Sequence, residues 1–278
     1  MSPESDAFEK SAKYIEKLYL NESFWDNNKT LCLLLDYDGT LSPIAPHPDQ
    51  TSMSPGNREA LEFIISQPNV MVAIITGRDA LNAKSVVALE NVTYAGNHGF
   101  EIHFPDGFIF NYELNQKLKE NYPKMVEGLN EISHDGAWVE DKKYSLTFHF
   151  RAVPAEYHKE LINKSTEIIK KMGFRPSPAH MAVEAKPPMQ WNKGYAAEYI
   201  LKHKFGEKWQ EKAIVLFMGD DTTDEDVMRV LQGRSLTFRV TANPDLESCA
   251  THKIPDTKTV TDILQQIQKR LSRRTPIQ

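Results

Sequence analysis

The sequence predicts an α/β protein, a doubly wound parallel-sheet core into which a second α/β domain is inserted. Short apolar runs alternate with helical patterns along most of the 278 residues, which is typical of successive βαβ units. Several of these runs stop abruptly at a glycine and an acidic or hydroxyl side chain, and in open sheets of this kind ligands bind at the carboxyl ends of the strands. The stretch between Arg78 and Trp191 is too long for a single crossover connection. We therefore expect a Rossmann-like core with an inserted domain.

The predicted core consists of residues 29–112 and 186–278. Its strands are expected near residues 31–36, 70–75, 92–95, 213–218 and 236–240, and its helices near 55–67, 79–90, 193–204, 224–232 and 259–274. The N-terminal residues 1–28 are mostly polar, and we expect a helical extension with apolar side chains along one stripe (Phe8, Ile15, Leu18 and Tyr19).

Residues 113–185 form the predicted inserted domain, with helices near 115–130 and 155–171, strands within 138–151, and a strand near 180–185. Along Tyr144–Arg151 the apolar side chains alternate with Ser145, Thr147, His149 and Arg151. Along the last strand His180, Glu184 and Lys186 share the polar face. This face is either a surface that recognises a polar ligand or the ordinary solvated side of an antiparallel sheet.

The composition bounds the function. Charged residues make up 26% of the chain and hydrophobic residues 40%, as in ordinary globular proteins, and the net charge of −5 argues against nucleic-acid binding. No apolar run is long enough to span a membrane, and the polar N-terminus has no signal-peptide core. The two cysteines, Cys32 and Cys249, do not suggest a disulfide scaffold. We expect a cytoplasmic protein.

The first motif follows the apolar run Leu31–Leu35, where Asp36 and Asp38 are separated by one residue and followed by Gly39. A solvated turn is the simplest interpretation. However, two adjacent carboxylates at the mouth of a buried sheet repel each other and favour a bound cation. The oxygen ligands make Mg²⁺ the expected ion.

Three further motifs follow in order. Thr76 and Gly77 end the run Val70–Ile75, where a hydroxyl and backbone N–H groups could bind an anion or simply cap a helix. Lys193 lies in the first turn of a predicted helix, which is unfavourable for the helix dipole unless an anion is near. The run Ala213–Met218 ends at a cluster of acids that includes Asp220, Asp221 and Asp224, and a metal explains the first of these better than a helix end does.

In this order, the four motifs resemble the haloacid dehalogenase-like phosphatase superfamily. Four segments are similar to one family within it, the trehalose-6-phosphate phosphatases: Gly96–Glu101, Val139–Arg151, Val183–Pro187 and Gly219–Asp226. The resemblance covers about residues 30–265 and implies that the inserted domain is a cap that closes over the site.

The resemblance implies a Mg²⁺-dependent phosphatase that hydrolyses trehalose 6-phosphate through an aspartyl-phosphate. The implied roles are as follows: Asp36 is the nucleophile and Asp38 the general acid and base; Thr76, Gly77 and Lys193 bind the phosphoryl group; Asp36, the carbonyl of Asp38 and Asp220 bind the metal; Asp221 and Asp224 orient these groups.

For the sugar, the resemblance implies Glu140, Arg151 and Glu184, with His180 where the family often has a lysine. Lys186 likewise stands where the family has an arginine, and a lysine cannot reproduce the planar guanidinium contact. These two differences leave the strictness of sugar recognition open.

Three alternatives remain at this point. The chain could act on sucrose phosphate or a hexose phosphate, or be a phosphomannomutase, which shares the first motif and the class of cap. It could also be a non-catalytic partner of a trehalose-phosphate synthase. The presence of Asp36, Asp38, Thr76, Lys193 and Asp220 together argues against the last alternative, because a non-catalytic domain has no physical need for buried acids.

Overall fold

The computed structural model describes residues 28–45, 47–179 and 181–273. The chain forms two compact units: a core unit, made by the chain up to Phe110 and from Trp191 onward, and an inserted unit, Asn111–Gln190. The predicted N-terminal helix falls almost wholly outside the described residues. None of the described helices is long and apolar enough to cross a membrane.

The core unit is built on an eight-stranded sheet in the order β12-β11-β10-β1-β2-β3-β4-β5. The pairs from β12 to β3 are parallel, and β4 pairs with β3 in the antiparallel sense. The strands are β1 Thr30–Leu35, β2 Val70–Ile75, β3 Val92–Gly96, β4 Glu101–His103, β5 Ile109–Asn111, β10 Ala213–Gly219, β11 Leu236–Val240 and β12 His252–Ile254. The predicted fold class is confirmed.

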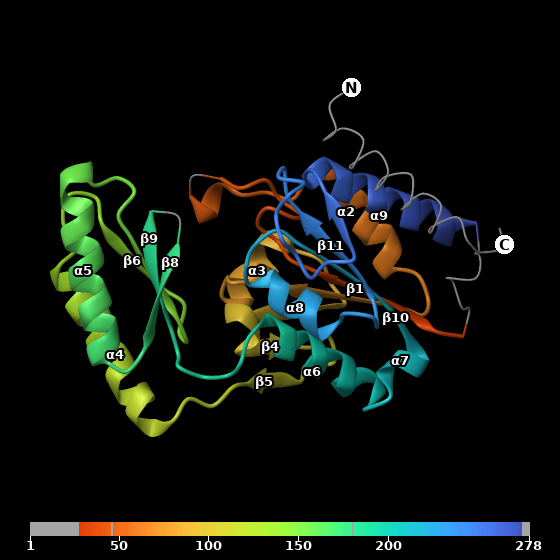
Figure 1. Cartoon of the computed structure of the whole chain (residues 1–278). Coiled ribbons are helices and arrows are strands. Elements are labelled where there is room, and N and C mark those ends of the chain that lie inside the picture. The colour runs from red at the N-terminus through yellow and green to blue at the C-terminus, as the bar shows by residue number, and fades with distance from the viewer. Residues whose placement is uncertain (1–27, 46, 180, 274–278) are drawn as a thin grey trace. The chain divides into compact units, whose positions relative to one another are not determined.

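Helices cover both faces of this sheet (Figure 1). One face packs against α2 (Pro55–Ile65), α3 (Ala80–Val87) and α9 (Thr257–Ser272). The other packs against α6 (Lys193–Phe205), α7 (Trp209–Lys212) and α8 (Asp224–Val230). The two apolar layers explain why the central strands read as continuous apolar runs instead of alternating ones.

Strand β1 lies at the centre of the core and positions the first motif. Leu33 and Leu35 pack into one apolar layer while Cys32 and Leu34 pack into the other, and all four are 0% exposed. Burying each leucine contributes about 1.5–3 kcal/mol. Because β1 is hydrogen-bonded to β10 and β2 along its length, Asp36 is delivered from a rigid strand.

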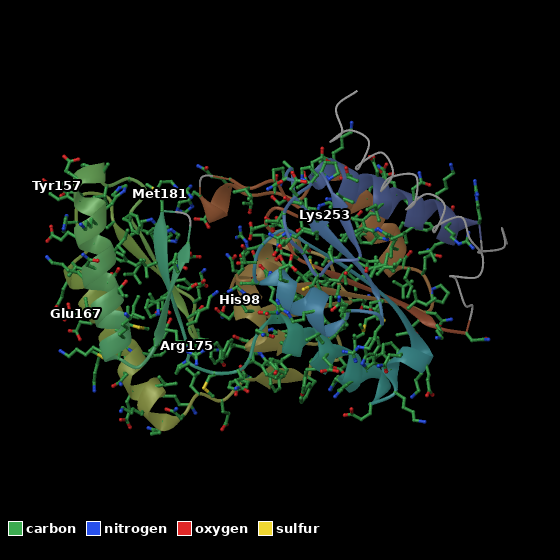
Figure 2. The ribbon with its side chains drawn as sticks, viewed as in Figure 1. His98, Tyr157, Glu167, Arg175, Met181 and Lys253 are labelled. Atoms are coloured by element: carbon green, nitrogen blue, oxygen red, sulfur yellow. The ribbon has the colours of Figure 1, made fainter. Side chains whose placement is uncertain are left out.

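The inserted unit has a four-stranded antiparallel sheet in the order β6-β7-β9-β8, with helices α4 (Gln116–Glu131) and α5 (Ala155–Lys171) along one face (Figure 1). Its strands are β6 Trp138–Asp141, β7 Leu146–His149, β8 Arg175–Ala179 and β9 Ala182–Lys186. Exposed Tyr157 and Glu167 point outward from α5 (Figure 2). The apolar residues Leu146, Phe148, Val183 and Ala185 are buried, as the alternation predicted.

One expectation for the inserted unit was wrong, and one of its strands was not predicted. The strand predicted through Arg151 ends at His149, because Val153 donates to the Phe150 carbonyl in a turn, and Arg151 is exposed in that turn. Strand β8 was not predicted, because its sequence contains Pro176 and Pro178. Its position at the sheet edge accommodates both prolines, since an edge strand can lack ladder donors.

Candidate active site

The motifs that contain Asp36, Thr76 and Asp220 meet at the carboxyl ends of β1, β2 and β10. In the sheet register Leu35 lies opposite Met218 on one side and Ile74 on the other. Asp36, the loop that follows Gly219, and Thr76 are therefore neighbours. This is the arrangement predicted from three apolar runs that end in polar residues.

Lys193 joins the first and last motifs. Its Nζ donates to Asp36 Oδ1 at 2.7 Å and to Asp224 Oδ1 at 2.8 Å. The exposed fractions are 3% for Lys193, 4% for Asp36 and 0% for Asp224, so one cation is shared by two acids away from water. Thr40 also donates to Asp36 Oδ2, at 3.3 Å.

Burial acts on the pKa values of Asp36 and Lys193 in opposite senses, but both values end above their ordinary range. Burial raises the pKa of Asp36 well above its ordinary value, and the charge of Lys193 offsets only part of that effect. Burial alone would lower the pKa of Lys193, but the carboxylates of Asp224 and Asp36 outweigh it and raise the pKa. Lys193 is therefore a permanent cation at neutral pH, and Asp36 needs it to remain ionised.

The local structure explains why a lysine occupies the first turn of α6. Asn192 caps this helix by accepting from the Tyr195 N–H, and Lys193 follows directly. Gly194 packs so closely against α8 that a Cβ would lie 2.4 Å from the Asp226 carbonyl oxygen. This close helix packing brings Lys193 to Asp224, and the carboxylates compensate for its unfavourable place at a helix N-terminus.

Asp220 completes an acidic group. Ligand oxygens of Asp36, Asp220 and Asp224 all lie within 4.8 Å of one another. Asp220 packs against Gly39, whose φ is +79°, and a Cβ at Gly39 would lie 2.1 Å from Asp220 Oδ2. Burial, with a further contribution from the charge of Asp224, raises the pKa of Asp220 to about 7. Neighbouring carboxylates repel one another when they ionise, and a hard divalent cation with oxygen ligands relieves that repulsion.

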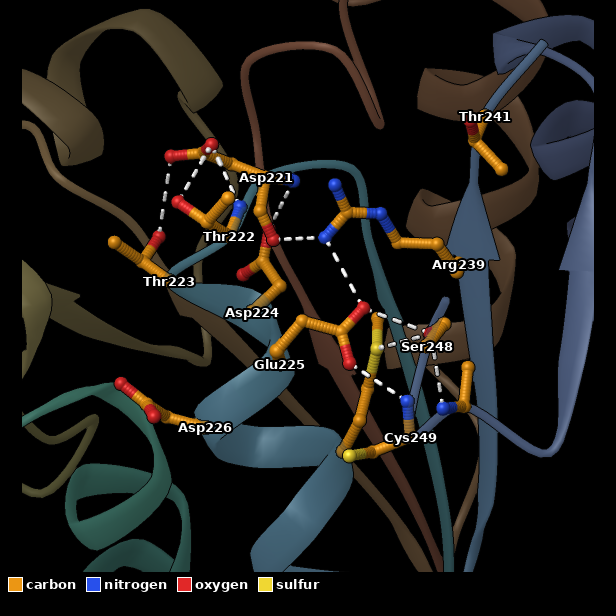
Figure 3. A network of polar contacts seen from close by, with 12 residues as sticks. Asp221, Thr222, Thr223, Asp224, Glu225, Asp226, Arg239, Thr241, Ser248 and Cys249 are labelled. Carbon is orange, nitrogen blue, oxygen red and sulfur yellow. Dashed lines mark hydrogen bonds and ion pairs between the residues drawn. The ribbon is translucent and has the colours of Figure 1, made fainter. Parts of the chain in front are cut away.

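The loop that carries Asp220 is supported by a network of polar contacts, shown in Figure 3. The Asp221 N–H donates to Asp224 Oδ2 at 2.9 Å, and Arg239 from β11 donates to the Asp221 carbonyl. Glu225 accepts from Arg239 at 3.3 Å, from the Ser248 hydroxyl at 2.7 Å and from the Cys249 N–H at 2.7 Å. Three separate segments thus fix the position of the acidic loop.

Asp38 lies outside the acidic group of the described residues and faces a different cation. Arg78 donates from Nε to Asp38 Oδ2 and from Nη2 to Asp38 Oδ1, both at 2.7 Å. The two acids of the first motif therefore point to different partners, Asp36 to Lys193 and Asp38 to Arg78. The buried Tyr37 between them packs into the core.

Thr76 and Gly77 form a tight turn at the end of β2. Thr76 is 1% exposed, and its hydroxyl oxygen accepts from the Arg78 N–H at 3.2 Å. The ring of His98 lies against Gly77, where a Cβ would approach His98 Cε1 to 2.9 Å. His98 itself has a φ of 58° and donates its N–H to the Thr76 carbonyl (its place is labelled in Figure 2). His98 is thus part of the same turn.

The predicted sugar-binding residues divide among three situations. Glu140, Thr147 and Glu184 are successive partners across β6, β7 and β9, so they share one face. Glu140 accepts from His149 at 2.9 Å and pairs with Lys142, while Glu184 pairs with Lys186 at 2.8 Å. Arg151 lies in the turn after β7, and His180 lies outside the described residues.

The sequence of the core and inserted units matches a known protein family. The family model for trehalose-phosphatase matches residues 34–264, from β1 to α9. The chain belongs to the trehalose-phosphatase family. The matched range contains every residue of the acidic group, Lys193, and the whole inserted unit.

Relatives in plants share this sequence over most of its length. The trehalose-phosphatase chain is 30% identical over 265 residues to "Probable trehalose-phosphate phosphatase 2" of Oryza sativa subsp. japonica, covering 86% of this chain and 68% of the relative. It is 29% identical over 255 residues to "Trehalose-phosphate phosphatase B" of Arabidopsis thaliana, covering 86% and 66%. The chain therefore spans about two thirds of the length of these relatives.

Solved structures share the fold. The C-terminal domain of Candida albicans trehalose-6-phosphate phosphatase superposes with a TM-score of 0.74 at 20% identity, covering 93% of this chain and 96% of that one. The C-terminal domain of the Candida albicans trehalose synthase regulatory protein superposes with a TM-score of 0.64 at 12% identity, covering 91% and 97%. At these identities the structures show a common fold and no more.

Sequence reasoning did not assign roles to several residues that this trehalose-phosphatase site brings together. Arg78 and His98 adjoin the first two motifs, and Glu225 and Arg239 support the fourth. The Thr-Gly-Arg and Asn-His-Gly sequences were signals for the first two. No local sequence pattern predicts that Glu225 contacts the Ser248–Cys249 segment, because that contact depends on the tertiary fold.

Proposed function

We propose that this trehalose-phosphatase hydrolyses trehalose 6-phosphate to trehalose and phosphate through an aspartyl-phosphate on Asp36. The observation that carries the proposal is the position of Asp36. It is a buried carboxylate at the tip of the central strand, with Lys193 at 2.7 Å and two further acids within 4.8 Å. A rigid nucleophile beside a fixed cation suits phosphoryl transfer, in which positioning and charge stabilisation dominate.

In the first step a carboxylate oxygen of Asp36 forms a bond to phosphorus as the bond from phosphorus to the sugar oxygen breaks. The electron pair leaves with the sugar oxygen, which takes a proton from the Asp38 carboxyl group. Lys193, the Thr76 hydroxyl and the Gly77 N–H bind the phosphoryl oxygens. Lys193 and Thr76 are 3% and 1% exposed, so neither has to be dehydrated when substrate enters.

In the second step a water molecule gives a proton to the Asp38 carboxylate and attacks phosphorus. The bond between phosphorus and Asp36 breaks, phosphate leaves, and both acids return to their starting states. Asp221 and Asp224 orient the surrounding groups. The contacts of Asp224 with Lys193 and with the Asp221 N–H support that role.

Mg²⁺ is the cation that this donor set fits. Asp36, Asp220 and the backbone carbonyl of Asp38 would bind it, and the contact between Gly39 and Asp220 supports this set, since Gly39 directly follows Asp38. When bound, the ion neutralises charge on the phosphoryl oxygens and on the acids. Because the pKa of Asp220 is raised, a bound cation would favour the ionised form of this acid at neutral pH, which supports a metal site here.

For the sugar, we assign Glu140, Arg151, His180 and Glu184 of the inserted unit, which would act as a cap. The polar row formed by Glu140, Thr147 and Glu184 supports this, because carboxylates beside lysines are suitable partners for sugar hydroxyls.

The cellular location and a protein partner are also proposed. Free thiols at Cys32 and Cys249 support a reducing compartment, and we place the protein in the cytoplasm. A trehalose-phosphate synthase is the expected protein partner.

The test is phosphate release from trehalose 6-phosphate, sucrose 6-phosphate, glucose 6-phosphate and mannose 6-phosphate, each with Mg²⁺ and with chelator. We expect Mg²⁺-dependent release with a strong preference for trehalose 6-phosphate. Equal rates on all four esters would retain the phosphatase chemistry and overturn the substrate assignment. Transfer of phosphate between hydroxyls without release would indicate a mutase.

A further inference from the structure

Arg78 contacts Asp38 with the planar edge of its guanidinium group. Nε donates to Oδ2 and Nη2 donates to Oδ1, both at 2.7 Å. Both carboxylate oxygens are therefore engaged at once, in the bidentate geometry that only arginine provides. No sequence motif assigned a role to this arginine.

The guanidinium group is fixed from three further sides. Nη2 also donates to Thr51 Oγ1 at 2.8 Å, and Nη1 donates to Asn82 Oδ1 at 3.1 Å. The Tyr37 ring lies 5.3 Å from the guanidinium carbon. Thr51 precedes α2 and Asn82 belongs to α3, so separate segments of the core unit determine the orientation of Arg78.

The two members of the ion pair differ in their exposure to solvent. The Arg78 side chain is 7% exposed, whereas the Asp38 side chain is 38% exposed. If the pair separates, Arg78 keeps its contacts with Thr51, Asn82 and Tyr37, so its charge is not left without partners in the interior. Asp38 is more than one third exposed and can rotate without leaving a buried charge unpaired. Asp38 is therefore the member that moves.

We propose that Arg78 is a positioning residue for Asp38, which it holds in one defined orientation beside the site and releases toward the sugar oxygen during the reaction. This rests on the proposed function, in which Asp38 protonates the leaving group. In the observed orientation both oxygens of Asp38 accept from Arg78, and Asp38 lies outside the group formed by Asp36, Asp220 and Asp224. Proton transfer to a leaving oxygen near Asp36 therefore requires Asp38 to turn from Arg78 and to take up a proton from water before it gives one to the sugar oxygen, and Arg78 defines where that turn begins.

The test compares two phosphate esters that differ in their need for an acid. Trehalose 6-phosphate releases a sugar alkoxide, which requires a proton, whereas p-nitrophenyl phosphate releases a stable phenolate. The quantity is kcat/KM, which covers the steps up to formation of the aspartyl-phosphate. For Arg78→Gln we expect a loss of about 100-fold with trehalose 6-phosphate, at the lower end of the range for general acid catalysis, and about 3-fold or less with p-nitrophenyl phosphate.

Two further variants make the result specific. Thr51→Val removes one contact that orients Arg78 and leaves the ion pair intact, so it should show the same substrate-dependent loss at about 3- to 10-fold. In an Asp38→Asn background, Arg78→Gln should add little further loss with trehalose 6-phosphate, because both substitutions then act through one carboxyl group. If Arg78→Gln does not fold, Thr51→Val decides the proposal alone.

Equal losses on both esters would overturn the proposal, and so would additive effects with Asp38→Asn. Failure of the proposed function gives a different result: wild-type protein that releases no phosphate from trehalose 6-phosphate, or an Asp38→Asn variant that loses the same factor on both esters. The first would remove the substrate and the second would remove the acid, whatever Arg78 does.

Discussion

At the level of single residues, the defining feature of the site is that two neighbouring acids form ion pairs with different basic residues. Asp36 contacts the buried Lys193, and Asp38 contacts Arg78 at the edge of the site. The sequence predicted both acids because they follow an apolar strand, and it predicted Lys193 because a lysine in the first turn of a helix is unfavourable unless an anion is near. It did not predict Arg78 as the partner of Asp38, because the pairing depends on how the turn after β2 approaches the turn after β1.

Replacing Lys193 by methionine tests how the buried charges depend on one another. The variant leaves Asp36 and Asp224 without their shared cation, so we expect the free energy of unfolding to fall by about 3–5 kcal/mol. Loss of the cation raises the pKa of Asp36 further, because the charge of Lys193 no longer lowers it. A group whose pKa is raised on folding favours the folded state at low pH, so the deficit should be larger near about pH 8 than near about pH 5. Urea unfolding at both pH values measures this, and a deficit independent of pH would contradict it.

The raised pKa of Asp220 also predicts how metal affinity depends on pH. Since the pKa is about 7, a proton occupies Asp220 below that pH and must leave before a cation binds. We expect Mg²⁺ affinity to fall by up to about tenfold per unit as the pH drops from about 7 to about 5, and to level off above 7. Calorimetric titration with Mg²⁺ measures the affinity without turnover. A constant affinity across that range would show that Asp220 is ionised without metal.

At the scale of elements, apolar runs predicted the central strands well because burial on both faces leaves a continuous signal. Strand β2 and strand β11 occupy the predicted residues, and β1 is displaced by one. Strands β4, β5, β8 and β12 were not predicted. Three of them have three residues each and lie toward the sheet edges, where packing against neighbouring strands decides the conformation more than the local sequence does.

The support of the acidic loop by Glu225 can be tested at this scale. Glu225→Gln weakens the contacts to Arg239, Ser248 and Cys249, so the loop with Asp220 loses part of its support (Figure 3). We expect Mg²⁺ affinity to fall by about tenfold, as for residues that orient metal ligands. Asp226→Asn is the matched control, since Asp226 is the next residue and pairs with Arg229 on the helix surface. Equal effects of the two variants in calorimetry would count against this role.

At the scale of the molecule, the chain separates into two compact units. The core unit ends at Phe110 and resumes at Trp191, whereas the sequence predicted boundaries at 112 and 186. The family relationship extends over both units. The strand alternation correctly predicted that Thr147 and Glu184 share the polar face of the inserted sheet, whereas Arg151 lies in a turn and His180 lies outside the described residues. The assignment of this face to sugar recognition came from the resemblance, because a polar face alone does not distinguish a binding surface from a solvated one.

The proposed role of the inserted unit predicts a substrate-dependent effect. Glu184→Gln should raise KM for trehalose 6-phosphate by about tenfold, the effect of removing one charged hydrogen-bond acceptor. The rate with p-nitrophenyl phosphate, which has no sugar, should change little. Glu160→Gln on α5, an exposed glutamate paired with Lys164, is the control. If Glu184→Gln left KM unchanged, the polar row would have no part in sugar binding.

The most direct test of the aspartyl-phosphate mechanism is phosphate release from trehalose 6-phosphate by the wild-type protein and by Asp36→Asn, in Mg²⁺. Asparagine preserves the size of the side chain but is a very poor nucleophile. We expect rapid release by the wild-type protein and a loss of at least about 10³-fold in the variant. Near-normal turnover by Asp36→Asn would show that the aspartyl-phosphate does not form on Asp36.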